Sequence, residues 1–141
     1  MSQVAIVYPL LVQVALTLVL LVWMGRLRTG ALLKKEVRPE DIALGQPGWS
    51  AQTTQVSNSF RNQLEVPVLF YVLALLLLQT RLSDIIQVAL AWLFVLSRIA
   101  HAWVHTTSNN VRARGSIWGI GALIVIVMWI WFAVRLLSAS A

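Results

Sequence analysis

The stretch RNQLEVPVLFYVLALLLLQT, residues 61–80, decides how this chain folds. Its uncharged part, residues 66–80, is too short for a membrane-spanning helix, which needs about 20 residues at ~1.5 Å each. A helix of sufficient length must therefore begin near Arg61, so that Asn62 and Glu65 lie at or within the edge of the hydrocarbon. Polar groups at that depth are costly and need partners. The stretch predicts a membrane span whose polar partners come from elsewhere in the chain.

The composition of the whole chain agrees with a membrane protein. Of its 141 residues, 59% are hydrophobic and 11% are charged, whereas a soluble domain carries about 25% charged residues. Four long apolar segments occupy about residues 4–26, 61–80, 85–106 and 116–137. Each is long enough to cross a bilayer once, so we expect an all-α integral membrane protein with a single four-helix domain over residues 1–141. No Lys or Arg precedes the first segment and no small-residue cleavage site follows it, so we expect a retained span.

The net charge of +6 follows a pattern typical of membrane topology, and we expect no nucleic-acid partner. Eight Lys and Arg residues lie in or beside the first and third connections, against two at the opposite end. We call the end that carries Arg26, Arg28, Lys34, Lys35, Arg38, Arg61, Arg112 and Arg114 the basic face. The positive-inside rule predicts that this face, with the loop of residues 27–60, is cytoplasmic and that both termini lie outside the cytoplasm. We expect a multi-pass protein of a bacterial inner membrane.

The last third of the third segment offers partners for the polar start of the second. At 100° per residue, Arg98, His101, His105 and Asn109 fall within about 60° of one another on a helix. The second segment descends from the basic face and the third returns to it, so this stripe lies at the depth of Glu65. Ionisable residues within a membrane are a functional hypothesis by default.

Several of these residues also have a structural interpretation. Glu65 and Arg98 could neutralise each other between helices, and Asn62 could be an interhelical hydrogen-bond donor. Arg26 and Arg114, like Arg112, could be ordinary anchors of the basic face.

Metal binding is a weaker alternative. His101 and His105, four residues apart, could bind a metal with Glu65 as a third ligand. Two histidines at this spacing are a weak signal, and the spans contain no further clear carboxylate, so we expect no metal. The chain also has no cysteine, so a thiol must come from a substrate.

The order and spacing of several motifs resemble the family of membrane-associated proteins in eicosanoid and glutathione metabolism (MAPEG), in a bacterial-type form. The motifs are GRLR closing the first segment, RPED in the long loop, NxxE before VPVLFYV, RIAHAWVH late in the third segment, and RARG before the fourth. The family includes microsomal glutathione transferases, leukotriene and prostaglandin synthases, and a non-enzymatic lipid-binding member. The resemblance implies a homotrimer of four-helix protomers, with glutathione bound between adjacent protomers near the cytoplasmic face.

The resemblance also implies roles for single residues. Arg26 matches an arginine that holds a glutathione carboxylate. Glu65 matches a glutamate that takes the glutathione amino group, with Asn62 beside it. Arg98 and His101 match family positions in the third helix.

Further matches lie toward the fourth helix. Arg114 matches the arginine that stabilises the thiolate. His105 and Trp118 stand where several members have tyrosine, and the chain therefore departs from the family pattern at both positions.

We therefore expect a glutathione-dependent transferase or peroxidase that acts on lipophilic electrophiles in the bilayer. The expected partners are lipid, glutathione, a lipophilic small molecule and two further copies of the chain. The alternative is a non-enzymatic lipid-binding or scaffolding protein of the same fold. A proton or ion carrier is less favoured, because the polar stripe is confined to one half of the membrane.

Overall fold

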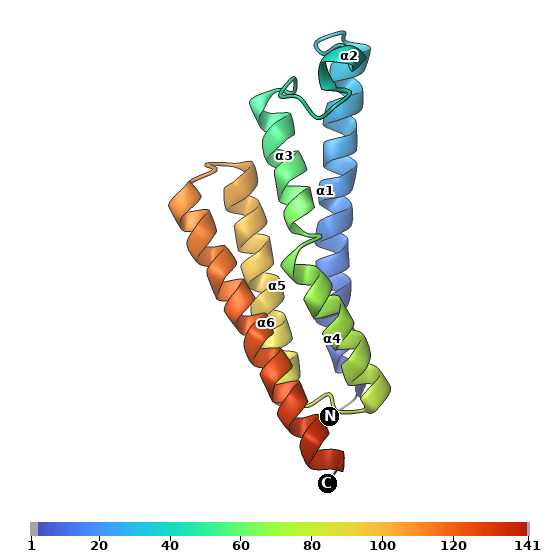
Figure 1. Ribbon diagram of the computed structural model, residues 1–141, viewed down its shortest axis with the longest axis vertical. Coiled ribbons are helices and arrows are strands. Elements are labelled where there is room, and N and C mark those ends of the chain that lie inside the picture. The colour runs from blue at the N-terminus through green and yellow to red at the C-terminus, as the bar shows by residue number, and fades with distance from the viewer. Residues whose placement is uncertain (1–2, 141) are drawn as a thin grey trace.

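The computed structural model describes residues 3–140 as helices that run up and down beside one another (Figure 1). The elements are η1 Gln3–Ile6, α1 Val7–Leu33, α2 Pro39–Ile42, α3 Ala51–Asn62, α4 Val66–Thr80, α5 Ile85–Thr106 and α6 Val111–Ser140. The start of α1 and the end of α6 lie at one end of the bundle, and the α1–α3 and α5–α6 connections lie toward the other (Figure 1). The described part of the chain has no strand, and the expected all-α class is confirmed.

Four helical units are long and apolar enough to cross a membrane. They are Gln3–Leu33, Ala51–Thr80, Ile85–Thr106 and Val111–Ala139. Large apolar side chains point outward on each unit, among them Leu18, Leu75, Leu93 and Leu123, all more than half exposed. Contiguous apolar surface of this extent suits lipid rather than water. The protein is therefore an integral, multi-pass membrane protein.

The second unit is broken, which differs from the single helix beginning near Arg61 that its apolar run predicts. α3 ends at Asn62 and α4 begins at Val66, with the intervening residues outside any helix. Pro67 explains the break, because a proline lacks an N–H for the carbonyl four residues earlier and its ring clashes with that carbonyl. Within a membrane, freed backbone groups are tolerated where they are buried in protein or line a cavity.

The buried amide of Gln63 fills this break. Its Nε2 donates to the carbonyl of Ser59 at 3.2 Å, and its Oε1 accepts from Nε2 of Gln13 at 3.0 Å. Both glutamine side chains are fully buried. A side chain of α1 therefore holds Gln63, within the irregular segment, by a hydrogen bond.

The expected long loop is largely helical. α1 continues to Leu33 and α3 already begins at Ala51, with Ser50 capping it by accepting from the backbone N–H of Thr53 at 3.2 Å. The pattern of α3 is hard to recognise in the sequence because polar residues such as Thr53 and Ser57 occupy buried positions beside Val56. The helix packs on α1 and α5. Both helices extend beyond α5 and α6 at the basic face (Figure 1).

α5 is the most buried of the four units. It contacts α1 and α3 and packs most extensively against α6. Gly121 permits the close approach to α6, because a Cβ there would lie 2.8 Å from Oγ of Ser97. Small residues at such contacts let membrane helices approach closely.

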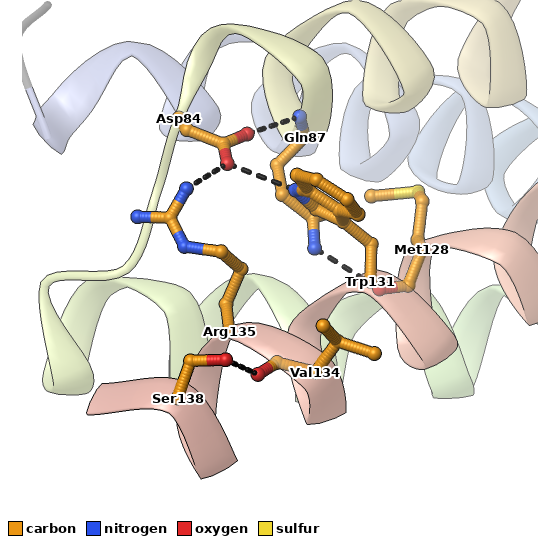
Figure 2. Close-up of polar contacts among 7 residues, drawn as sticks. All are labelled: Asp84, Gln87, Met128, Trp131, Val134, Arg135 and Ser138. Atoms are coloured by element: carbon orange, nitrogen blue, oxygen red, sulfur yellow. Dashed lines mark hydrogen bonds and ion pairs between the residues drawn. The ribbon is translucent and has the colours of Figure 1, made fainter. Parts of the chain in front are cut away.

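A polar cluster joins α5 to α6 at the end opposite the basic face (Figure 2). Asp84 caps α5 by accepting from the backbone N–H of Gln87 at 2.9 Å. Its other carboxylate oxygen accepts from Nε1 of Trp131 at 2.9 Å and from Nη1 of Arg135 at 2.8 Å. Nε2 of Gln87 donates to the carbonyl of Met128 at 3.0 Å. These bonds hold the start of α5 against the last turns of α6.

Candidate functional site

The break between α3 and α4 places two polar side chains at one level of the bundle. Asn62 is the last residue of α3, and Glu65 immediately precedes α4. The backbone N–H of Val68 donates to the carbonyl of Glu65 at 3.1 Å, which starts the new helix. The carboxylate of Glu65 caps no backbone N–H and is available for other contacts.

Asn62 connects Glu65 to the buried guanidinium of Arg98. Nη2 of Arg98 donates to Oδ1 of Asn62, and Nδ2 of Asn62 donates to Oε2 of Glu65 at 3.3 Å. The two ion pairs in the described chain lie elsewhere, so a direct pairing of Glu65 with Arg98, which the sequence left open, is absent. Glu65 is also exposed in the single chain rather than buried. The amide stands between the two charges because Asn62 ends α3 on the side that faces α5.

Both histidines lie on the same buried face of α5 as Arg98, which is hydrogen-bonded through Asn62 to Glu65. Nδ1 of His101 is 3.4 Å from Nη2 of Arg98. The rings of His101 and His105 meet edge to face, with centroids 5.4 Å apart. Asn109 does not continue the stripe, because α5 ends at Thr106. Within residues 3–140, no three His, Asp or Glu side chains gather closely enough to hold a metal.

Asn109 lies in the connection between α5 and α6, where it positions Arg114. Asn109 adopts a left-handed conformation with φ 50°, and its Oδ1 accepts from Nη1 of Arg114 at 2.6 Å. Oδ1 of Asn110 accepts from the backbone N–H of Ala113 at 3.1 Å and so caps α6. Arg114 therefore lies in the first turn of α6 with one of its terminal nitrogens held.

A pocket of about 260 Å³ opens between these elements. Its lining residues are Asn62, Glu65, His101, Val111, Arg114, Gly115 and Trp118. One carboxylate and one guanidinium thus face the same space. A ligand that carries both an ammonium and anionic groups matches this pair of charges.

An apolar groove follows the pocket along the seam of α4 and α6. Its volume is about 410 Å³, and it is lined by Val66, Leu69, Ala122, Val125, Ile126, Trp129 and Ile130. Val66 directly follows Glu65, and Ala122 lies about one helical turn beyond Trp118, so neighbouring stretches of the chain line the polar pocket and the groove. Apolar surface therefore begins next to the residues that line the charged pocket.

Arg26 lies apart from this pocket in the single chain. It is exposed on α1, beside a shallow apolar hollow lined by Leu18, Val19, Val22 and Trp23. Of the residues chosen from the sequence, the structure brings Asn62, Glu65, Arg98, His101, His105, Arg114 and Trp118 together. Arg26 does not join them within one chain.

Sequence reasoning missed two contributions to the site. The bond between Gln13 and Gln63 braces the break, and the only sequence signal was a lone glutamine in an otherwise apolar first span. The role of Asn109 was also missed, because helical periodicity placed it on α5. An Asn-Asn pair between two helices is a turn signal that indicates a cap.

One of three comparisons with known proteins produced a match. The family model described as the MAPEG family matches residues 6–134. No curated protein and no solved structure matches the chain significantly.

Proposed function

The chain belongs to the MAPEG family, and from this premise we propose that it binds glutathione at the pocket between the α3–α4 break, α5 and α6. A glutathione-related transferase or peroxidase role in a membrane fits this family. The observation that carries the proposal is the joint exposure of Glu65 and Arg114 to one pocket beside an apolar groove. Such an arrangement suits a polar tripeptide and a lipophilic second substrate.

The charges of glutathione complement those of the pocket. Its ammonium pairs with Glu65, which Asn62 orients through the 3.3 Å hydrogen bond. Its thiolate lies near Arg114 and the N-terminal end of α6, whose dipole favours negative charge. Arg26 supplies a carboxylate contact from the neighbouring protomer of a homotrimer, which agrees with its exposure on α1.

The proposed reaction is attack of the bound thiolate on a lipophilic electrophile. A sulfur–carbon bond forms as the electrophile loses its leaving group or, in an addition, gains a proton from water. With a lipid hydroperoxide, the thiolate instead takes the terminal oxygen and the alcohol leaves. A second glutathione then converts the sulfenic acid to a disulfide with loss of water. In both cases Arg114 stabilises the sulfur anion by its charge.

The proposal is tested by the ultraviolet absorbance of bound thiolate. The wild-type protein should show this absorbance when titrated with glutathione near neutral pH. Arg114→Leu should retain much of the affinity for glutathione but lose the thiolate signal. A wild-type protein that neither binds glutathione nor gives the signal would overturn the proposal.

A second candidate is a non-enzymatic lipid-binding protein. Its support is the apolar groove between α4 and α6, together with histidine and tryptophan at positions 105 and 118 in place of family tyrosines. Stabilisation by lipid but not by glutathione in a thermal-shift assay would favour this function.

A further inference from the structure

A second pocket lies at the basic face, outside the proposed glutathione site. Its volume is about 450 Å³. Its walls come from α1, α2, α3 and the connection between them, namely Arg28, Ile42, Gly45, Gln46, Pro47, Trp49, Thr54, Ser57, Asn58 and Arg61. It shares no residue with the pocket that contains Glu65 and Arg114.

The connection that closes this pocket is tightly built. Oε1 of Gln46 accepts from the backbone N–H of Leu44 at 2.8 Å, and its carbonyl accepts from Gly48 at 2.9 Å. A Cβ on Gly48 would lie 2.8 Å from Cγ2 of Ile42, so the chain packs closely on α2. Gly45, with φ 78°, allows the turn. The pocket therefore has a defined wall rather than a loose linker.

The charged side chains that line the pocket are both positive, and two buried polar atoms of its lining residues have no partner. No acidic residue lines it, and neither Arg28 nor Arg61 takes part in an ion pair of the described chain. Nε of Arg28 is buried without a hydrogen-bond partner. Ser57 is only 4% exposed, and its Oγ also has no partner. Unpaired buried donors are costly, and an anionic acceptor would satisfy them.

One side of the pocket is lined by apolar side chains. The guanidinium of Arg28 lies over the indole of Trp49, 5.2 Å from the ring centroid. Ile42 and Pro47 add apolar surface beside it. Arg28 is two residues beyond Arg26, about 3 Å along the helix, and the distribution of basic residues predicts that this end of α1 lies near the lipid headgroups.

We propose that this pocket binds a phosphate oxyanion, supplied by the headgroup of an anionic phospholipid. On binding, the side chains of Arg28 and Ser57 rotate toward the pocket, so that Nε and Oγ, which are buried in the free protein, donate to the phosphate oxygens, and Arg61 adds charge at the edge. Arginine suits this role because its donors match the geometry of phosphate. The glycerol part of the lipid lies on Trp49 and Pro47.

The test is thermal unfolding in zwitterionic detergent with three short-chain probes: dihexanoylphosphatidylglycerol, dihexanoylphosphatidylcholine and inorganic phosphate. Phosphatidylglycerol should raise the Tm in a saturable way, and phosphatidylcholine should have little effect. Inorganic phosphate alone, saturating at a similar concentration, would identify a soluble phosphate as the source of the anion. Stabilisation by phosphatidylglycerol only would identify the lipid.

Matched variants distinguish binding in this pocket from nonspecific attraction of an anion to the positively charged surface. Arg28→Gln should raise the half-saturating concentration of the anion by about tenfold, which corresponds to ~1.4 kcal/mol. Ser57→Ala should raise it by a smaller factor. Lys34→Gln removes an equal charge from an exposed residue outside the pocket and should change it by no more than about twofold, as exposed charges contribute little.

Equal losses in Arg28→Gln and Lys34→Gln would overturn the proposal, as would the absence of any saturable Tm shift. Glutathione titration of the same variants keeps this test independent of the proposed function. Arg28→Gln should bind glutathione as the wild type does, because its side chain does not line that pocket.

Discussion

Asn62 is the residue on which the arrangement of the proposed site depends. Its amide accepts from Arg98 with one end and donates to Glu65 with the other. Arg98 is fully buried, and its Nε and Nη1 have no partner within the described chain. A buried guanidinium with so few acceptors is sensitive to the loss of any one of them. Asn62 thus both stabilises Arg98 and orients Glu65.

We expect Asn62→Ala to destabilise the protein without ligand. The lost hydrogen bond to a charged group should reduce the free energy of unfolding by about 1.5–3 kcal/mol. Unfolding by sodium dodecyl sulfate in mixed micelles measures this change. Asn58→Ala is the matched control, since Asn58 is exposed one turn earlier on α3 and should have a small effect. Equal losses in the two variants would contradict the role of Asn62.

Glu65→Gln should affect binding rather than stability. Removing the charge that pairs with the glutathione ammonium should weaken binding by about 1–3 kcal/mol, measured by calorimetric titration. Without ligand, stability should change by no more than ~0.5 kcal/mol, because Glu65 is exposed and outside both ion pairs of the described chain. A less stable variant with unchanged glutathione affinity would make Glu65 a structural residue.

At the scale of elements, the most extensive contact joins α5 and α6. Gly121 faces Ser97 across this contact, whereas a Cβ on Gly119 would meet nothing within 4 Å. The contact fixes α6 relative to the buried face of α5, and with it the distance between Arg114 and the polar residues of α5. The two glycines therefore provide a matched pair of sites for substitution.

Gly121→Val should destabilise the bundle by about 1–3 kcal/mol, because the added atoms force α5 and α6 apart. Gly119→Val changes helix propensity equally but meets open space, so its effect should be clearly smaller. Thermal unfolding in detergent compares the two variants. The prediction fails when both variants unfold at the same temperature.

At the scale of the whole molecule, the site is incomplete without a second chain if Arg26 binds glutathione. Arg26 lies outside the pocket of its own chain, beside an apolar hollow on α1. An exposed arginine beside apolar side chains near the edge of the hydrocarbon favours an acidic or polar partner. A neighbouring protomer that carries glutathione would provide one.

We expect three chains per particle. Native mass spectrometry of protein released from detergent micelles should give the mass of a trimer, and Arg26→Leu should weaken glutathione binding in that trimer. A stable monomer that binds glutathione with wild-type affinity would exclude a site shared between protomers.

The orientation in the membrane is a separate prediction. The eight-to-two distribution of basic residues predicts that the basic face is cytoplasmic. A reporter fused after Ala141 should therefore be detected outside the cytoplasm, and one inserted near Gln46 inside it. The reverse result would place the proposed glutathione pocket on the wrong side for cytoplasmic glutathione.

The sequence by itself determined the number of spans and the grouping of the polar residues. Hydrocarbon thickness sets the length of an apolar run, and helical periodicity places Arg98, His101 and His105 on one face, so both features are local. Only the tertiary structure decided that α3 and α4 are separate helices and that Asn62 stands between Arg98 and Glu65. The physical reason is that a break at Pro67 persists in a membrane when distant groups satisfy it. Gln13, fifty residues away, contributes by donating to the side chain of Gln63 within the break, and no local pattern indicates that pairing.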